Sequence, residues 1–260
     1  MFSVQDRDRL HDRILEMAKA DIRVVSGAVV GSLALSNGDR WSDLDLTFAV
    51  SDQFSIYDVL EEWTQTIFKE FGAAHLFDLP SGPSIYRVFL IPTCLQFDLS
   101  FTPASKFGAT SPKFRLLFGS AVERSFHQPP SAHELFGYAV HHALRARFCI
   151  ERGRYWQAEY WISSLRDYAL NLACLRRGLP ANNARGYDDL PSEVQALFKD
   201  SFVTSLERTE LLRVFGCVVE GFLQETDEVK ELAATVKPQL LELTRDWDDS
   251  PDHRSLSFHK

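Results

Sequence analysis

The short segment Ser42-Asp43-Leu44-Asp45-Leu46 constrains the fold of this chain more than any other. Leu44 and Leu46 recur with the period of two that is typical of a strand, so Asp43 and Asp45 are predicted to point together from the opposite face. Two adjacent carboxylates repel each other unless a cation lies between them. Mg²⁺ fits this arrangement, because it prefers oxygen ligands and is commonly held by one or two carboxylates together with substrate phosphates.

A second motif, Gly31-Ser32, lies ten residues upstream of that segment. The apolar run at residues 24–30 predicts a buried strand that ends at Gly31, where the backbone can turn sharply and approach a ligand closely. Residues 33–35 then predict a helical turn whose free N–H groups face a phosphate. Gly-Ser by itself is ordinary loop chemistry, so its meaning comes from its combination with the paired Asp residues. Together they suit the triphosphate tail of a nucleotide.

A third carboxylate lies on the segment 95–101, which alternates strictly between apolar and polar residues. This alternation predicts a half-buried strand with Asp98 on its polar face. Taken alone, Asp98 would be interpreted as a solvent-facing strand residue. Beside Asp43 and Asp45 it would complete a cluster that can hold two metal ions, one at the attacking oxygen and one at the departing oxygen of a displacement.

The pattern Gly31-Ser32, Asp43-Leu44-Asp45 and Phe97-Asp98-Leu99 resembles the DNA polymerase β-like nucleotidyltransferase superfamily. Within it, the chain is most similar to the small bacterial aminoglycoside and lincosamide nucleotidyltransferases. The stretch 38–43, Gly-Asp-Arg-Trp-Ser-Asp, is similar to the segment before the paired Asp residues in those enzymes. At Ser36-Asn37, where many members carry Arg-Gly, this chain departs from the family pattern.

The resemblance covers residues 31 to 98 and implies a role for each motif. The implied nucleotide-binding residues are Gly31, Ser32 and Ser42. The implied metal ligands, for two Mg²⁺ ions per site, are Asp43, Asp45 and Asp98, with Asp98 also helping to deprotonate the acceptor. The implied activity is transfer of a nucleoside monophosphate, with AMP from ATP favoured, to a hydroxyl of a small molecule, with release of pyrophosphate.

The charge balance bears on the acceptor. The chain has 28 basic and 36 acidic residues, a net charge of −8, whereas a protein that binds a nucleic acid backbone usually displays a basic face. A cationic small molecule is therefore favoured over nucleic acid. Arg145, Arg147, Arg152 and Arg154 are clustered and could meet the triphosphate, but a solvated helix face is the preferred interpretation.

Several absences predict a cytoplasmic protein. We expect a monomer or a homodimer. The sequence has no 18-residue apolar run and no pattern of a signal peptide, so no membrane association is expected. The adjacent His141 and His142 cannot both face one site on a helix, which argues against structural zinc. The four cysteines lack a Cys-x-x-Cys pair and are expected to be reduced, buried small hydrophobes. They are Cys94, Cys149, Cys174 and Cys217.

The predicted fold class is α+β: an N-terminal nucleotidyltransferase domain at residues 1–125, with a mixed β-sheet and flanking helices, followed by an α-helical bundle at 126–260 that binds the acceptor. In the first domain, helices are predicted around residues 10–18 and 56–71, and strands near 24–30, 44–50, 84–91 and 94–101. In the second, helices are predicted at 132–153, 155–178, 191–203, 206–223 and 229–247.

One carboxylate of the helical domain is a candidate general base. Glu159 lies off the apolar stripe of the helix predicted at 155–178. In the family that the motifs resemble, an acidic residue of the helical domain can act on the acceptor hydroxyl. The simpler interpretation, a surface carboxylate paired with a nearby Arg or Lys, is favoured.

Two other functional classes stay open. The first is a nucleotidyltransferase that modifies protein or RNA in a regulatory or toxin–antitoxin role. Arg254 and His259 match the Arg-x-x-x-x-His ribonuclease spacing found in partners of such proteins, but they lie in a polar tail and are interpreted as a chance match. The second is a catalytically inactive nucleotide-binding relative, against which the intact set of three Asp residues argues.

Overall fold

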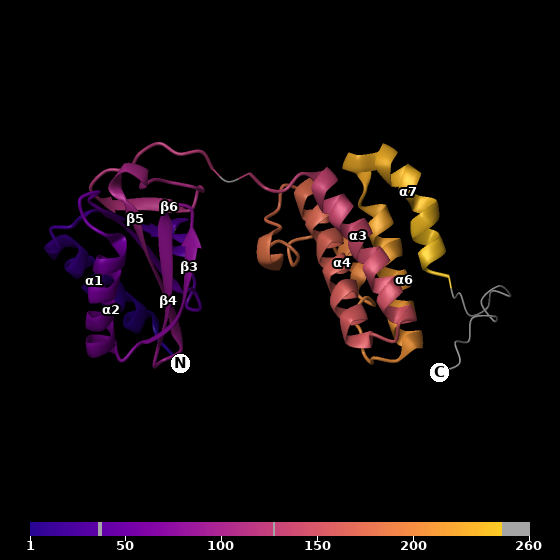
Figure 1. Ribbon diagram of the computed structural model, residues 1–260, viewed down its shortest axis with the longest axis horizontal. Coiled ribbons are helices and arrows are strands. Elements are labelled where there is room, and N and C mark those ends of the chain that lie inside the picture. Colours follow the sequence, from indigo (N-terminus) through magenta and orange to yellow (C-terminus); the bar gives the residue numbers. More distant parts are fainter. Residues whose placement is uncertain (36–37, 127, 246–260) are drawn as a thin grey trace. The chain divides into compact units, whose positions relative to one another are not determined.

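The computed structural model describes residues 1–35, 38–126 and 128–245 of the chain (Figure 1). The chain divides into two compact units, Met1–Gln128 and Pro129–Lys260, and each has its own hydrophobic core. The first unit combines a mixed sheet with helices and the second is helical, which confirms the predicted α+β fold class. Arg254 and His259 lie outside the described residues.

Six strands form the mixed sheet of the first unit, in the order β3-β4-β5-β2-β1-β6. Strands β2 and β5 are parallel, and every other neighbouring pair in this order is antiparallel. Four of the strands were predicted, whereas β3 and β6 were not. The strands are β1 (Val24–Val30), β2 (Leu44–Val50), β3 (Ala74–Ser81), β4 (Ser84–Ile91), β5 (Leu95–Pro103) and β6 (Phe114–Phe118).

Helices α1 (Val4–Ala20) and α2 (Ile56–Phe71) cover one face of this sheet and confirm the two predicted helices. Each begins at a serine cap, Ser3 or Ser55, whose side chain accepts a hydrogen bond from a backbone N–H of the first turn. Their apolar faces pack on alternate strand residues, such as Leu44, Leu46 and Phe48 of β2. Because side chains alternate along a strand, Asp45 is directed to the opposite face of the sheet.

The two unpredicted strands lie at the edges of the sheet. Every residue of β3 is exposed, so β3 lacks the buried alternation on which strand prediction depends. Strand β6 has only five residues, none of them fully buried, and it pairs with β1. Both strands are therefore formed by pairing with a neighbour, which a local sequence pattern does not reveal.

The second unit consists of α3 (Ala132–Glu151), α4 (Tyr155–Arg176), α5 (Ser192–Phe198), α6 (Arg208–Gln224) and α7 (Lys230–Leu243) (Figure 1). All five predicted helices are present, but α5 ends at Phe198, five residues before the predicted end. Short 3₁₀ turns complete the two units: η1 (Gly31–Leu35), η2 (Ala104–Lys106), η3 (Asn182–Ala184) and η4 (Asp227–Val229). In the described part of the chain, no helix is both long enough and apolar enough to span a bilayer.

Two predictions about individual side chains were wrong. Arg147 is fully buried rather than part of a solvated face, because it shares its side of α3 with Ala143 and Ile150, and it forms an ion pair with Glu151 (2.9 Å). Cys94 is exposed in the turn between β4 and β5, where it adopts a positive φ of 64°, so it is not a core residue.

The other cysteines agree more closely with the prediction. Cys149 and Cys174 are buried, Cys217 is partly buried, and all four cysteines are free thiols.

Candidate active site

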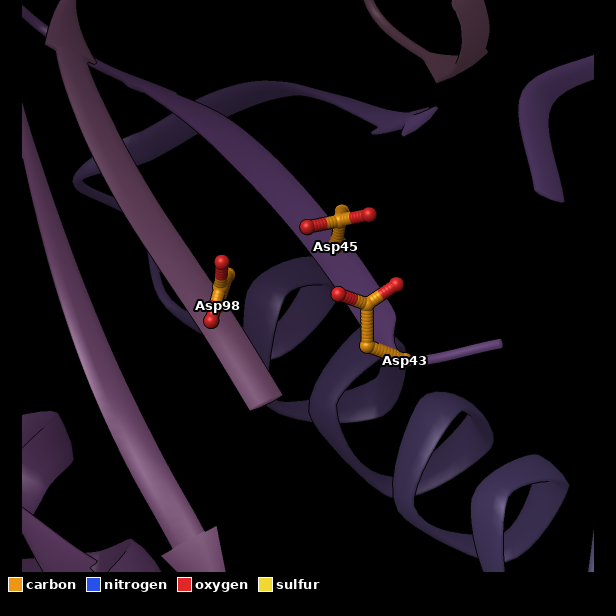
Figure 2. Close-up of side chains that lie close together, drawn as sticks. All are labelled: Asp43, Asp45 and Asp98. Carbon is orange, nitrogen blue, oxygen red and sulfur yellow. The ribbon is translucent and has the colours of Figure 1, made fainter. Parts of the chain in front are cut away.

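Three aspartates converge at one end of the parallel strand pair β2–β5. Asp45 of β2 and Asp98 of β5 are register partners, and Asp43 lies immediately before β2. One carboxylate oxygen from each residue lies within 4.8 Å of the others. Figure 2 shows the three carboxylates gathered beside the ends of the two neighbouring strands. The structure thus brings together the three residues that sequence spacing selected.

Buried neighbours along each strand hold these carboxylates in place. Leu44 and Leu46, on either side of Asp45, are at most 1% exposed, as are Phe97 and Leu99 on either side of Asp98. Because these apolar side chains are committed to the core under α1 and α2, the aspartates must point away from it. All three aspartates are partly buried, so their charges are only partly screened by water.

The electrostatics of the cluster favour a bound cation. Burial raises the pKa of Asp98 above its ordinary value, and the negative charge of Asp43 raises it further, while a hydrogen bond from Gln96 (3.0 Å) opposes the shift. Among residues 1–35, 38–126 and 128–245, neither Asp43 nor Asp98 forms an ion pair with a basic side chain. A divalent cation is well suited to relieve this repulsion, and the oxygen-only donor set fits Mg²⁺.

The Gly31-Ser32 turn lies directly against this cluster. Gly31 ends β1 with a φ of +71°, the left-handed region that favours glycine, and starts the 3₁₀ turn η1. A Cβ added at Gly31 would overlap the Asp45 carboxylate. The backbone of the predicted phosphate-binding turn and the predicted metal ligands therefore belong to one site.

Ser42, predicted to contact the nucleotide, has a defined structural partner. Its hydroxyl accepts a hydrogen bond from the backbone N–H of Asp39 (3.0 Å) and donates to the Asp39 carboxylate (3.2 Å). The hydroxyl thus shapes the turn that precedes Asp43, and its contact with a nucleotide stays a prediction.

Sequence reasoning missed one residue of this region, Arg7 of α1. Its guanidinium donates hydrogen bonds to the backbone carbonyls of Asp39 (2.7 Å) and Ser42 (3.0 Å). No local sequence pattern could have predicted this contact, because more than thirty residues separate Arg7 from these carbonyls. Its acceptors are also backbone atoms, which every residue carries.

Glu159 belongs to the second unit, on α4, and is partly buried. The hydroxyl of Ser163, one turn further along the helix, donates a hydrogen bond to Glu159 Oε1 (2.7 Å). Within the described part of the chain Glu159 pairs with no Arg or Lys, so the expected surface ion pair is not present. Its role as a general base stays a prediction.

Comparisons with known proteins give structural similarities but no family or curated match. No protein-family model matches the chain, and no curated protein matches it. Among solved structures, the chain is similar to an aminoglycoside 6-adenyltransferase from Bacillus subtilis, with 12% sequence identity and a TM-score of 0.40 over 91% of this chain and 97% of that one.

Proposed function

We propose that this protein is a Mg²⁺-dependent nucleotidyltransferase, which transfers a nucleoside monophosphate from a nucleoside triphosphate to a hydroxyl of a small molecule. The observation that supports the proposal is the convergence of Asp43, Asp45 and Asp98, with the Gly31 backbone packed against the Asp45 carboxylate. Three carboxylates this close are costly without a cation, and a glycine turn beside them suits the phosphates that such a cation accompanies.

The three aspartates would hold two Mg²⁺ ions. When bound, these ions would neutralise charge on the polyphosphate and lower the pKa of the acceptor hydroxyl. The Gly31-Ser32 turn would orient the phosphates through its backbone N–H groups. Catalysis by this chain would then consist mainly of positioning and charge stabilisation.

The proposed reaction is a single displacement at the α-phosphorus. The acceptor oxygen forms a bond to the α-phosphorus, the bond from that phosphorus to the bridging oxygen breaks, and pyrophosphate leaves. The proton of the acceptor hydroxyl passes to a carboxylate, for which Asp98 is the first candidate. This role is proposed on the motif resemblance and on the position of Asp98 within the cluster.

The helical unit is proposed to bind the acceptor, and Glu159 is the candidate within it for a second proton acceptor. A small cationic acceptor is favoured by the net charge of −8, because an acidic protein attracts cations and repels the backbone of a nucleic acid. ATP is proposed as the preferred donor on the motif resemblance.

A screen for Mg²⁺-dependent pyrophosphate release tests the proposal. The wild-type protein is incubated with each of the four nucleoside triphosphates and with aminoglycosides, lincosamides, RNA and proteins as acceptors. We expect release with one class of small hydroxyl compound. Asp45→Asn should lower that rate by a factor on the order of 10³, since it removes a ligand of the cations that would stabilise the transition state. Asp12→Asn, on the exposed surface of α1, is the control that should keep full activity.

Thermal stabilisation by Mg²⁺ and nucleotides completes the test. Stabilisation of the wild type without turnover on any acceptor would instead identify an inactive nucleotide-binding relative. Turnover only with RNA or protein would overturn the small-molecule assignment. If no triphosphate gives either stabilisation or turnover, the proposal as a whole is overturned.

A further inference from the structure

The turn at residues 39–42, which leads directly into Asp43, is fixed by a dense set of hydrogen bonds. The backbone N–H of Ser42 donates to the carbonyl of Asp39 (3.3 Å), and the backbone N–H of Trp41 donates to the Asp39 carboxylate (2.8 Å). The Ser42 hydroxyl adds its two bonds to Asp39. These contacts close the turn on itself, but they do not attach it to the rest of the unit.

Arg7 makes the shorter bonds of that attachment, beside a long bond from the Arg40 guanidinium to the carbonyl of Phe2 (3.5 Å). It lies in the first turns of α1, a helix anchored at its start by the reciprocal capping bonds of Ser3 and Asp6. Arg7 is only 6% exposed, and Nη1 donates to both Asp39 O (2.7 Å) and Ser42 O (3.0 Å). Burying a guanidinium is unfavourable unless hydrogen bonds replace those it made to water. The two carbonyls supply such bonds and therefore hold Arg7 in place.

The bond to Ser42 O has a direct consequence for Asp43. The carbonyl of Ser42 and the N–H of Asp43 belong to the same planar peptide unit, so fixing one fixes the other. On its other side Asp43 joins Leu44, which is fully buried at the start of β2. The backbone of Asp43 is therefore held at both ends, by Arg7 through the turn and by the core through Leu44.

Arg7 also lies beside the phosphate-binding turn. It lines a small cavity together with Leu33 of η1 and Leu44 of β2. The same guanidinium thus lies where helix α1, the Gly31-Ser32 turn and the first residue of β2 come together. Arg13, two turns further along α1, has a different setting, because it is 41% exposed and pairs with Glu70 on α2 (2.7 Å).

We infer that Arg7 is a positioning residue of the active site, which holds the peptide unit before Asp43 so that its carboxylate meets those of Asp45 and Asp98. The inference rests on the proposed function for its catalytic meaning. Groups hydrogen-bonded directly to a metal ligand typically change metal affinity by about 10-fold to 100-fold when they are lost. Arg7 acts on Asp43 through the peptide unit of Ser42, so we expect an effect near the lower end of that range.

The test uses the full-length chain with Arg7→Met, Arg7→Lys and the control Arg13→Met. We expect Arg7→Met to weaken Mn²⁺ binding about 10-fold or more, measured by calorimetry, and to lower kcat about 100-fold with a smaller effect on KM for the nucleotide. Arg7→Lys keeps the charge and three donors and should restore part of both properties. Arg13→Met should leave both unchanged.

Amide hydrogen exchange supplies a readout that does not depend on metal or activity. In Arg7→Met the hydrogen-bonded amides of Asp39, Trp41 and Ser42 should exchange faster, while those in the middle of β1 and β2 keep their protection. Unchanged exchange in the turn, or equal losses in Arg13→Met, would overturn the positioning role. If Arg7→Met does not fold, Arg7→Lys carries the same comparison. A wild-type protein that binds no Mn²⁺ would overturn the proposed function, while the exchange data would still decide the role of Arg7.

Discussion

Asp45 of β2 and Asp98 of β5 are direct register partners in a parallel strand pair, so two carboxylates lie side by side on one face of the sheet. Asp43 adds a third from the residue before β2. Like charges at this spacing oppose folding, and a chain keeps them where a cation or a reaction needs them.

Asp98→Asn should stabilise the metal-free protein while lowering its activity. The pKa of Asp98 is raised on folding, so its ionised form destabilises the folded state at every pH above the ordinary carboxyl range. Removing the charge should therefore raise the melting temperature in EDTA at neutral pH. Excess Mg²⁺ should stabilise the wild type more than the variant, because the variant has lost a ligand. A variant less stable than wild type in EDTA would contradict the unfavourable burial of the ionised Asp98 and its repulsion by Asp43.

Gly31→Ala should abolish metal binding while destabilising the fold only moderately. Alanine at a φ of +71° costs about 1 to 2 kcal/mol, and its Cβ would overlap the Asp45 carboxylate. Gly82→Ala is the matched control, since Gly82 has a φ of +57° and no atom within 4 Å of an added Cβ. Urea unfolding should show similar losses for the two variants, whereas only Gly31→Ala should lose Mn²⁺ binding. If the two variants bind Mn²⁺ with equal affinity, the Gly31 turn does not contribute to metal binding by the aspartates.

Asp21→Asn should destabilise the first unit in a pH-dependent way. Hydrogen bonds from Arg23 (2.8 and 2.9 Å) and from the Trp63 indole (2.9 Å) lower the pKa of Asp21 to about 2. Because folding lowers this pKa, the ionised Asp21 stabilises the fold at pH values above its ordinary pKa of 3.8. This contribution is lost as the pH falls towards 2. The shift corresponds to about 2 kcal/mol for this mostly buried group.

The check is urea unfolding of wild type and Asp21→Asn at pH 7 and at successively lower pH. The difference in unfolding free energy should be largest at neutral pH and should shrink below pH 4. Asp12→Asn, whose side chain is 75% exposed on the same α1, should differ from wild type by less than about 0.5 kcal/mol. A difference that does not depend on pH would mean that packing, not charge, links Asp21 to its neighbours.

Glu225→Ala should destabilise the helical unit by about 3 kcal/mol. Glu225, directly after α6, is 3% exposed and pairs with Arg177 (2.7 Å) and Arg176 (3.7 Å) at the end of α4. Its loss leaves the partly buried Arg177 guanidinium without its paired carboxylate, whereas Arg176 keeps Asp227 and Glu228. Asp227→Ala, which removes the more exposed partner of Arg176, should cost less than about 1 kcal/mol. Urea unfolding of the second unit gives both values, and similar losses would contradict the buried-pair argument.

Strand and helix patterns were predictable where one face of an element is buried. Residues 44–50 and 95–101 alternate because one side of each strand meets α1 and α2, and this alternation also placed Asp45 and Asp98 on the other side. Strands β3 and β6 carry no such signal, because they are stabilised by pairing at the edges of the sheet. The burial of Arg147 also escaped prediction: its partner Glu151 lies only four residues along the chain, but the packing of the whole helical unit decides that this side of α3 is covered.

By itself, the sequence determined which face each aspartate takes and that Gly31 ends a strand at a turn, because period and backbone freedom are local properties of the chain. Only the tertiary structure decided that β2 pairs with β5 in the register that sets Asp45 beside Asp98, and that the Gly31 backbone packs against Asp45. It alone also brought Arg7 to the turn before Asp43. Pairing, register and contacts across tens of residues depend on the packing of the whole unit, and no local spacing encodes them.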